Sequence, residues 1–436
     1  MPLNKKHFLI ITGIYLLIQF AYVLFLSLPF SSDSLRFYEL ARDCQLNHTF
    51  YPGPHNHYDD FIDSPVYVNY VLLLLNLVPS AAAILFMNIV LNLLQLYLLM
   101  ITARKLFNNE NYALLAGLLY ILYLTNLGAV LLNVSEFLFG ICMLGSFYCY
   151  LQNQKRHWLL CGILLGVGIG VRQVGFALLF SYITLFAIAV LRKQAPWRKM
   201  ACITGGMMLV ILATGLIIKS NFGMFMFTAN SGPQNILMGA NDYATGSYNT
   251  RVFAQGNAGY IENLAAKTPA EKQAYWKQQS VNWIQANPVK WLLFIPKKLF
   301  YMFAWDDWSI NTLMHTTDWN LHTIAKMAAT GNTAQIMAEK SLAYKAGFLI
   351  LYLYHHLFYF IVLALMAWQF YYYHFNRKIF ITEFLVIYLF AFYGIAITVM
   401  SVGAARYKYP YFIMLLPTII PMLVNIHKNK IRTKRV

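Results

Sequence analysis

Long apolar stretches recur along this chain and constrain its fold more than any other feature. A stretch of about 18 or more residues crosses the ~30 Å hydrocarbon core of a bilayer as a helix. The chain has 436 residues, of which 59% are hydrophobic and 11% charged, whereas a soluble domain carries about 25% charged residues. We therefore predict an all-α polytopic membrane protein rather than a series of soluble domains.

The apolar stretches predict about ten transmembrane helices. They are expected at 8–29, 80–103, 111–128, 131–151, 157–191 (two short passes that turn near Arg172 and Gln173), 200–219, 343–371, 380–402 and 409–426. Three regions follow from this division. An N-terminal membrane module spans 1–219 and contains a first outer loop at 30–79, an outer segment spans 220–340, and C-terminal helices span 341–436.

The net charge of +17 raises the question of a nucleic-acid partner. However, basic residues cluster where apolar stretches end, at Lys5, Lys6, Arg104, Lys105, Lys155, Arg156, Arg192, Lys193, Arg198, Lys199, Arg377, Lys378 and between 428 and 435. Such clusters mark cytoplasmic loops. We therefore expect no nucleic-acid partner. We expect an inner (plasma) membrane protein with both termini cytoplasmic.

Acidic residues follow the opposite distribution. Of the 16 acids, 13 fall in the first outer loop or the outer segment. A transporter keeps its ionisable residues at the middle of the membrane, and only Glu136 and Glu383 lie within the predicted spans. Chemistry is therefore expected on the extracytoplasmic side.

The first outer loop opens with a candidate catalytic carboxylate. Ser32 is placed to cap a helix, which puts Asp33 in the first turn, close to the membrane. A carboxylate held there is suited to take a proton from a hydroxyl or amine as that group attacks a lipid-linked electrophile. The alternative is that Asp33 only stabilises the N-terminus of the helix.

Five motifs, in order along the chain, resemble those of the GT-C fold glycosyltransferases, and in particular the family-39-like group with protein O-mannosyltransferases and lipid A aminoarabinose transferases. They are the Asp-x-x-x-x-Tyr-x-x-Ala pattern at 33–41, the pattern at 133–139 that contains Glu136, the glycine-rich run from Gly162 to Arg172, the loop at 235–246, and the basic-aromatic-Pro pattern at 406–410. Two positions depart from the family. Ser34 stands where many members have a second acid, and Gln173 stands where a Pro is usual.

The resemblance implies a GT-C-like bundle and an inverting, metal-independent glycosyltransferase with an extracytoplasmic active site. The donor would be a monosaccharide on polyprenyl phosphate, the acceptor a lipid, glycan or protein, and Asp33 the catalytic base. Two alternatives stay open. One is a ligase or polymerase of lipid-linked oligosaccharides, and the other is a transporter or flippase of lipid-linked sugar.

A lipid phosphate requires cations at the outer membrane surface, and arginine binds phosphate in a bidentate manner. The candidates for donor-phosphate binding are Arg36, Arg172, Arg406 and Lys408. The alternative is that these side chains simply extend to the lipid headgroups. Glu136 is expected to pair with one of these cations, and the alternative is that it caps a break in the membrane.

Sugar or acceptor hydroxyls are expected to bind to polar side chains of the outer loops. The candidates are Tyr38, His55, His57, Asp59, Asp60, Asp63, Asn241 and Asp242. The histidines and carboxylates of this set also have the donor types of a divalent-cation site, although the resemblance favours no cofactor. Within the outer segment, residues 287–305 predict an amphipathic helix at the membrane interface.

Overall fold

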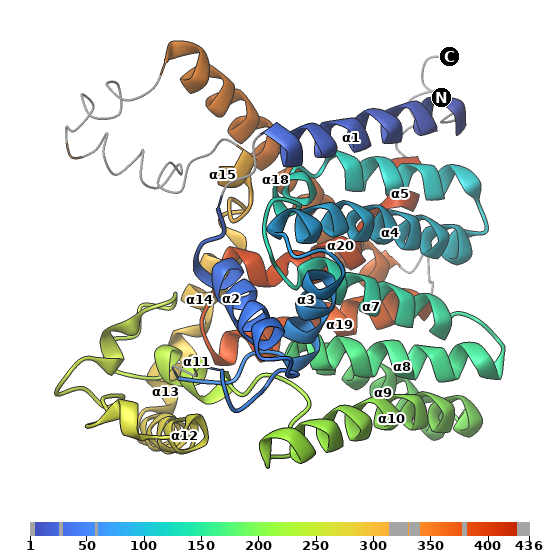
Figure 1. The fold of residues 1–436 in the computed structure, drawn as a ribbon. Helices are drawn as coiled ribbons and strands as arrows, with labels where there is room; N and C mark the ends of the chain where they lie inside the picture. The colour runs from blue at the N-terminus through green and yellow to red at the C-terminus, as the bar shows by residue number, and fades with distance from the viewer. Residues whose placement is uncertain are drawn as a thin grey trace, which may run out of the picture.

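The computed structural model describes residues 5–25, 29–56, 60–313, 330, 341–376 and 382–424. Within these ranges the chain is helical and contains no strand, which confirms the predicted all-α class. Long helices lie side by side in one bundle, and shorter helices gather at one end of it (Figure 1).

The bundle contains the helices that the apolar stretches predicted. They are α1 (Lys5–Phe25), α4 (Ala81–Phe107), α5 (Glu110–Leu122), α7 (Glu136–Tyr150), α8 (Lys155–Val171), α9 (Phe176–Leu191), α10 (Trp197–Phe222), α18 (Leu342–Asn376), α19 (Thr382–Met400) and α20 (Tyr409–Leu415), the last extended by η5 (Leu416–Ile419). Seven stretches among the described residues are long and apolar enough to cross a membrane. The expected count of about ten is therefore not confirmed, because α5, α7 and α8 are shorter than a full span.

The turn predicted near Arg172 and Gln173 is present. Helix α8 ends at Val171, and η1 (Gln173–Gly175) leads directly into α9. Helix α8 also packs closely on α10, because a Cβ at Gly162 would lie 2.0 Å from the backbone oxygen of Ile203. Small residues allow this close approach of helix backbones in membrane proteins.

The first outer loop holds two helices, α2 (Ser32–Leu46) and α3 (Pro65–Leu77). Helix α2 was predicted, but its N-cap is Ser31 rather than Ser32, and the Ser31 side chain makes no capping hydrogen bond. Helix α3 was not predicted. Its start is well defined, because the Ser64 hydroxyl accepts a hydrogen bond from the Tyr67 backbone N–H and Pro65 takes the first helical position.

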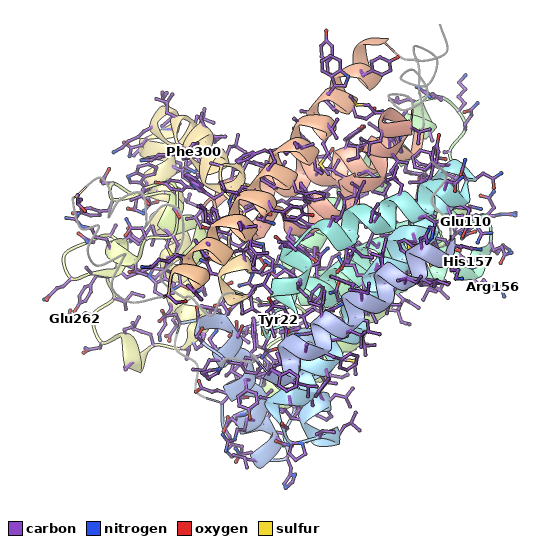
Figure 2. All side chains as sticks on the ribbon, turned by 90° about the horizontal axis from the view of Figure 1, so that it is seen from above. Tyr22, Glu110, Arg156, His157, Glu262 and Phe300 are labelled. Carbon is purple, nitrogen blue, oxygen red and sulfur yellow. The ribbon has the colours of Figure 1, made fainter. Side chains whose placement is uncertain are left out.

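The outer segment contributes short elements at one end of the bundle (Figure 1). They are α11 (Gly232–Gly239), η2 (Thr250–Phe253), η3 (Leu264–Ala266), α12 (Pro269–Ala286), α13 (Pro288–Leu293), α14 (Ile295–Phe303) and α15 (Ile310–Leu313). The expected amphipathic helix at 287–305 is thus two helices, and Pro296 stands in the first turn of the second. Figure 2 shows Glu262 and Phe300 of this segment at the opposite end of the molecule from Glu110, Arg156 and His157.

Candidate active site

Four charged side chains meet where four helical elements begin or end. Asp33 lies in the first turn of α2, Glu136 in the first turn of α7, Arg172 directly after α8, and Arg406 in η4 (Ala405–Lys408), which leads into α20. A helix favours acids in its first turn and bases after its last. The local dipoles of α2, α7 and α8 therefore stabilise the charges that these helices present.

Arg406 is the centre of this charged cluster. Its Nη1 donates to Asp33 Oδ2 at 2.9 Å and its Nη2 donates to Glu136 Oε2 at 3.2 Å, while its Nε donates to Glu136 Oε1. Arg172 pairs with Glu136 from the other side and lies 3.4 Å from the Ser135 hydroxyl. Glu136 is fully buried, whereas the Asp33 side chain is 42% exposed. One arginine thus links a sealed carboxylate to an accessible one.

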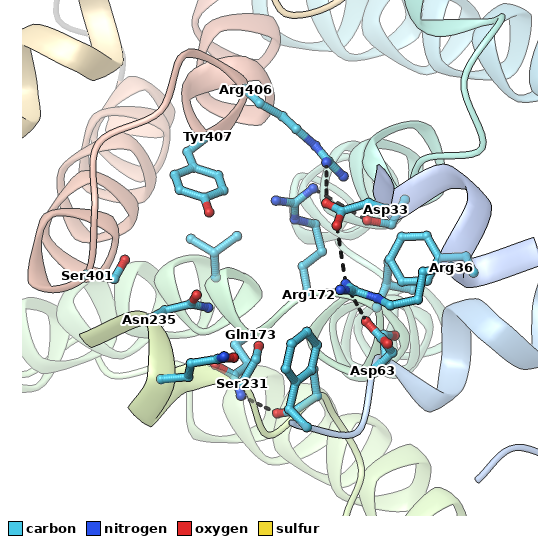
Figure 3. A pocket seen from close by; sticks show the side chains of 18 of the residues that line it. Asp33, Arg36, Asp63, Arg172, Gln173, Ser231, Asn235, Ser401, Arg406 and Tyr407 are labelled. Atoms are coloured by element: carbon cyan, nitrogen blue, oxygen red, sulfur yellow. Dashed lines mark hydrogen bonds and ion pairs between the residues drawn. The ribbon is translucent and has the colours of Figure 1, made fainter. Parts of the chain in front are cut away.

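Arg36 extends the cluster along α2. Its Nη2 lies 3.3 Å from Asp33 Oδ1 and 3.0 Å from Asp63 Oδ1, and the ring of Phe61 lies beneath its guanidinium. Figure 3 shows Arg36, Arg172 and Arg406 converging on the two aspartates. With Glu136, three carboxylates balance three guanidiniums here.

The first outer loop is fixed to the bundle around this cluster. The Ser64 hydroxyl donates to the Gly170 backbone oxygen at 2.7 Å, and Asn133 Nδ2 donates to the Ser34 backbone oxygen at 2.9 Å. The outer segment is held to the same loop, because Asn230 and Ile62 exchange two hydrogen bonds. Hydrogen bonds to backbone atoms therefore hold the first outer loop both to the bundle and to the outer segment.

A cavity of about 890 Å³ opens over the cluster. Its polar lining includes Asp33, Arg36, Glu39, Asp43, His55, Asp60, Asp63, Ser135, Arg172, Gln173, Ser231, Gln234, Asn235, Tyr248, Ser401, Arg406 and Tyr407. Figure 3 shows Asn235 and Ser401 across the cavity from Asp33. Cavities of this volume hold small-molecule ligands.

The predicted sugar or acceptor residues divide into three groups. His55, Asp60 and Asp63 line the cavity. Tyr38 does not line it and packs edge-on against Phe30 at 5.6 Å between ring centroids. His57 and Asp59 lie outside the described residues.

Asn241 and Asp242 lie beside a separate hollow of about 170 Å³. The carboxylate of Asp242 is 69% exposed and lies 2.9 Å from Lys290 Nζ. Hydrogen bonds from Lys290 and then from Trp283 lower the pKa of Asp242. The structure therefore brings neither residue into the main cavity.

Lys408 also lies outside the cavity. Its side chain is 1% exposed, and its Nζ lies 2.9 Å from Asp306 Oδ1. Of the four predicted phosphate-binding cations, the structure brings together Arg36, Arg172 and Arg406 only.

Sequence reasoning missed several polar groups of the cavity wall, namely Gln173, Ser231, Gln234, Asn235, Tyr248, Ser401 and Tyr407. Asn235 and Tyr407 fall within the motifs at 235–246 and 406–410, so membership of a motif could have identified these two residues as candidates. The expected pairing of Glu136 with one of the candidate cations is confirmed, and the structure shows that it pairs with two of them, Arg172 and Arg406. Among the described residues, no group of three or more His, Cys, Asp or Glu is placed to hold a metal ion.

Comparisons with known proteins give one family match. Residues 63–218, roughly a third of the chain, match the family described as dolichyl-phosphate-mannose-protein mannosyltransferase. This stretch contains Asp63, Glu136 and Arg172 but neither Asp33 nor Arg406. Comparison with curated proteins by sequence finds no match.

Three solved structures are similar at low sequence identity. ArnT from Cupriavidus metallidurans bound to undecaprenyl phosphate is 14% identical with a TM-score of 0.46, over 96% of this chain and 78% of that one. ArnT in the apo state has the same identity and score, over 94% and 76%. The oligosaccharyltransferase AglB from Archaeoglobus fulgidus, in complex with an inhibitory peptide and a dolichol-phosphate, is 12% identical with a TM-score of 0.48. The alignment covers 99% of this chain and 52% of AglB.

The matched stretch contains two of the five motifs, at 133–139 and at 162–172, together with the apolar helices α4 to α9 of the bundle. The resemblance predicted from the sequence is thus confirmed: the chain is a multi-pass membrane protein, and its residues 63–218 are similar to the dolichyl-phosphate-mannose-protein mannosyltransferase family, a family of GT-C glycosyltransferases.

Proposed function

We propose that this protein moves a monosaccharide from a polyprenyl-phosphate donor to an acceptor at the outer leaflet of the membrane, with inversion at the anomeric carbon. One observation carries the proposal. An accessible carboxylate, Asp33, shares Arg406 with a buried carboxylate, Glu136, at the wall of a ligand-sized cavity. The family match to glycosyltransferases that use a lipid-phosphate donor supports the same chemistry.

The donor phosphate binds to the arginines in this proposal. The cluster is charge-balanced without substrate, so a phosphate can be accommodated only if a guanidinium changes partner. Arg406 is suited to this exchange, since it retains Glu136 while it releases the exposed Asp33. Arg172, between α8 and η1, approaches the same point and contributes a second guanidinium.

The exchange of partners leaves Asp33 available as the general base. The Asp33 carboxylate takes the proton of the acceptor hydroxyl or amine, and the acceptor atom forms a bond to the anomeric carbon. The bond from that carbon to the phosphate oxygen breaks on the opposite face, and polyprenyl phosphate leaves with the electron pair. Arg406 and Arg172 stabilise the charge that develops on the leaving phosphate.

The acceptor and the sugar bind along the remaining polar wall of the cavity. His55, Asp60 and Asp63 come from the first outer loop, while Asn235 and Tyr248 come from the outer segment. Hydroxyl groups of a sugar are recognised by such amide and carboxylate oxygens. We propose that no cofactor takes part, since the guanidiniums of Arg406 and Arg172 supply the positive charge that the leaving phosphate requires.

The proposed orientation places the cavity outside the cytoplasm and the basic loops inside. Glu110 and Arg156 lie at the opposite end of the molecule from the outer segment. Reporter fusions after residues 155 and 195 should read cytoplasmic, and fusions at 50 and 260 should read extracytoplasmic. Identical readings at 195 and 260 would overturn this orientation.

Donor dependence tests the proposal directly. The purified protein in lipid nanodiscs should consume a polyprenyl-monophosphate sugar and release polyprenyl phosphate together with a new glycoside, both detected by mass spectrometry. Use of a diphosphate-linked oligosaccharide instead would support the ligase or polymerase. Movement of intact lipid-linked sugar across vesicles, without cleavage, would support the transporter.

A further inference from the structure

A second charged cluster lies behind the cavity, sealed from it. Its centre is Asp306, in the turn between α14 and α15, which is fully buried. Asp306 Oδ1 lies 2.9 Å from Lys408 Nζ, and Oδ2 accepts a hydrogen bond from the Tyr123 hydroxyl at 2.6 Å. His355 Nε2 lies 3.1 Å from Oδ2, and the Thr125 hydroxyl lies 3.2 Å from it.

These partners come from four parts of the chain. Asp306 belongs to the outer segment, Tyr123 to the turn after α5, His355 to α18, and Lys408 to η4. Burial alone would raise the pKa of Asp306, but the charge of Lys408 and the hydrogen bond from His355 outweigh it and hold that pKa well below its usual range. The partners of this carboxylate thus fix four elements relative to one another.

Lys408 connects this sealed cluster to the active site. Its Nζ donates to the backbone oxygen of Ala405 at 3.2 Å and to the backbone oxygen of Trp305. The first of these bonds closes the η4 turn on itself, and the second joins the turn to the outer segment. Arg406 lies within the same turn, two residues before Lys408.

The start of this turn is held by the outer segment as well. The Gly403 N–H donates to the Gly246 backbone oxygen at 2.9 Å. A Cβ at Gly403 would lie 2.0 Å from the backbone oxygen of Lys298, so α14 packs directly on this backbone. The orientation of the Arg406 side chain therefore depends on contacts that the outer segment makes with residues 403–408.

We infer that Asp306 is a positioning residue, which acts through Lys408 to hold the Arg406 guanidinium between Asp33 and Glu136. The role assigned to Arg406 as a phosphate ligand rests on the proposed function, but its placement by Asp306 does not. The outer segment thereby sets the position of the Arg406 guanidinium, which binds the donor phosphate in the proposed function. Lys408 contributes through this pairing and not through a contact with the donor.

The test measures Arg406 directly and requires no substrate. Phenylglyoxal modifies accessible guanidiniums, and mass spectrometry of peptides gives the rate at each arginine. In Asp306→Asn, which keeps the size of the side chain but removes its charge, Arg406 should react at least about threefold faster than in the native protein, because a guanidinium freed from its ion pairs is more accessible. The rate at Arg104, which pairs with Glu110 at the opposite end of the molecule, should stay unchanged and serves as the internal control.

A binding cycle gives the functional readout, with undecaprenyl phosphate alone as the probe. Asp306→Asn should weaken binding about tenfold in the native background, yet by no more than about twofold when Arg406 is already lysine, since two residues that act through one contact are not additive. In an Arg104→Lys background the loss should remain about tenfold, because Arg104 pairs with Glu110 far from the cluster and shares no partner with Arg406.

Two results would overturn the inference. One is an Arg406 modification rate equal to the native rate in a folded Asp306→Asn protein. The other is the same loss of binding in all three backgrounds, which indicates a general structural role. If Asp306→Asn does not fold, Tyr123→Phe removes one hydrogen bond to Asp306 and should raise the Arg406 rate in the same direction. Failure of the native protein to bind undecaprenyl phosphate would contradict the proposed function, while the modification rates would still decide the inference.

Discussion

Arg406 and Lys408 lie two residues apart on one turn, and the structure uses them in opposite ways. The side chain of Arg406 is 22% exposed and pairs with Asp33, which is 42% exposed. The side chain of Lys408 is 1% exposed and pairs with Asp306, which is fully buried. One cation faces a cavity, and the other is sealed among four elements.

The difference shows which cations can serve a ligand. A partly exposed ion pair exchanges partners at small cost, since water screens the charges when they separate. A sealed pair cannot do so, because either partner left alone in the interior lacks both water and a counter-ion. Within the same turn, Arg406 is therefore suited to bind a substrate anion and Lys408 to hold the structure.

The largest expected effect concerns the sealed pair. Lys408→Ala leaves Asp306 without its cation, and removal of one partner from a buried pair typically costs about 3–5 kcal/mol. Thermal unfolding of the detergent-solubilised protein should show a lower midpoint for Lys408→Ala than for Arg406→Ala. Equal midpoints would remove the distinction between the two cations.

The next effect concerns the open pair and appears chiefly in function, because the buried Glu136 keeps Arg172 as its cation when Arg406 is removed. Arg406→Ala should weaken donor use about tenfold to a hundredfold, since charge-assisted hydrogen bonds contribute about 1.5–3 kcal/mol. The apparent affinity for the acceptor should change much less, because only the donor carries the phosphate. Steady-state kinetics with each substrate varied in turn measure both quantities, and an unchanged donor KM would place Arg406 among the structural cations.

The sequence predicted the helices far better than it predicted which charges meet. Apolar runs located the bundle helices because hydrophobicity over a long window is a local property. Helix α3 was not predicted, because its 13 residues are too few to span a membrane. It also lies in a loop that carries acids and histidines.

The pairing of charges depends on the tertiary structure. Asp33 and Arg406 are 373 residues apart in sequence, and they were assigned to one site only through the family resemblance. The motif at 406–410 contains both Arg406 and Lys408, and the neighbouring sequence does not indicate that one side chain faces a cavity while the other is buried. In the sequence, Asp306 is simply one of two adjacent carboxylates between tryptophans, and its partners Tyr123, His355 and Lys408 are distant in sequence.

The smallest effect is expected at an ion pair that belongs to neither cluster. Asp242 pairs with Lys290 on the surface, and its carboxylate is largely exposed. Exposed pairs contribute little to stability, so Asp242→Asn should leave the unfolding midpoint and the turnover near those of the native protein. A large loss of turnover would show that the hollow beside Asp242 takes part in acceptor binding.

The central claim, that Asp33 is the base, is tested most directly by the turnover of Asp33→Asn. General-base catalysis contributes about 10²–10⁴-fold, so turnover should fall by at least about 10²-fold. Binding of undecaprenyl phosphate should persist or strengthen, because the amide no longer competes with the phosphate for Arg406. The matched control is Asp43→Asn on the same helix, whose carboxylate accepts a hydrogen bond from Asn56 at 2.7 Å and which should lose far less activity. Near-native turnover in Asp33→Asn, with activity lost in Asp43→Asn or Asp60→Asn, would contradict the assignment of the base.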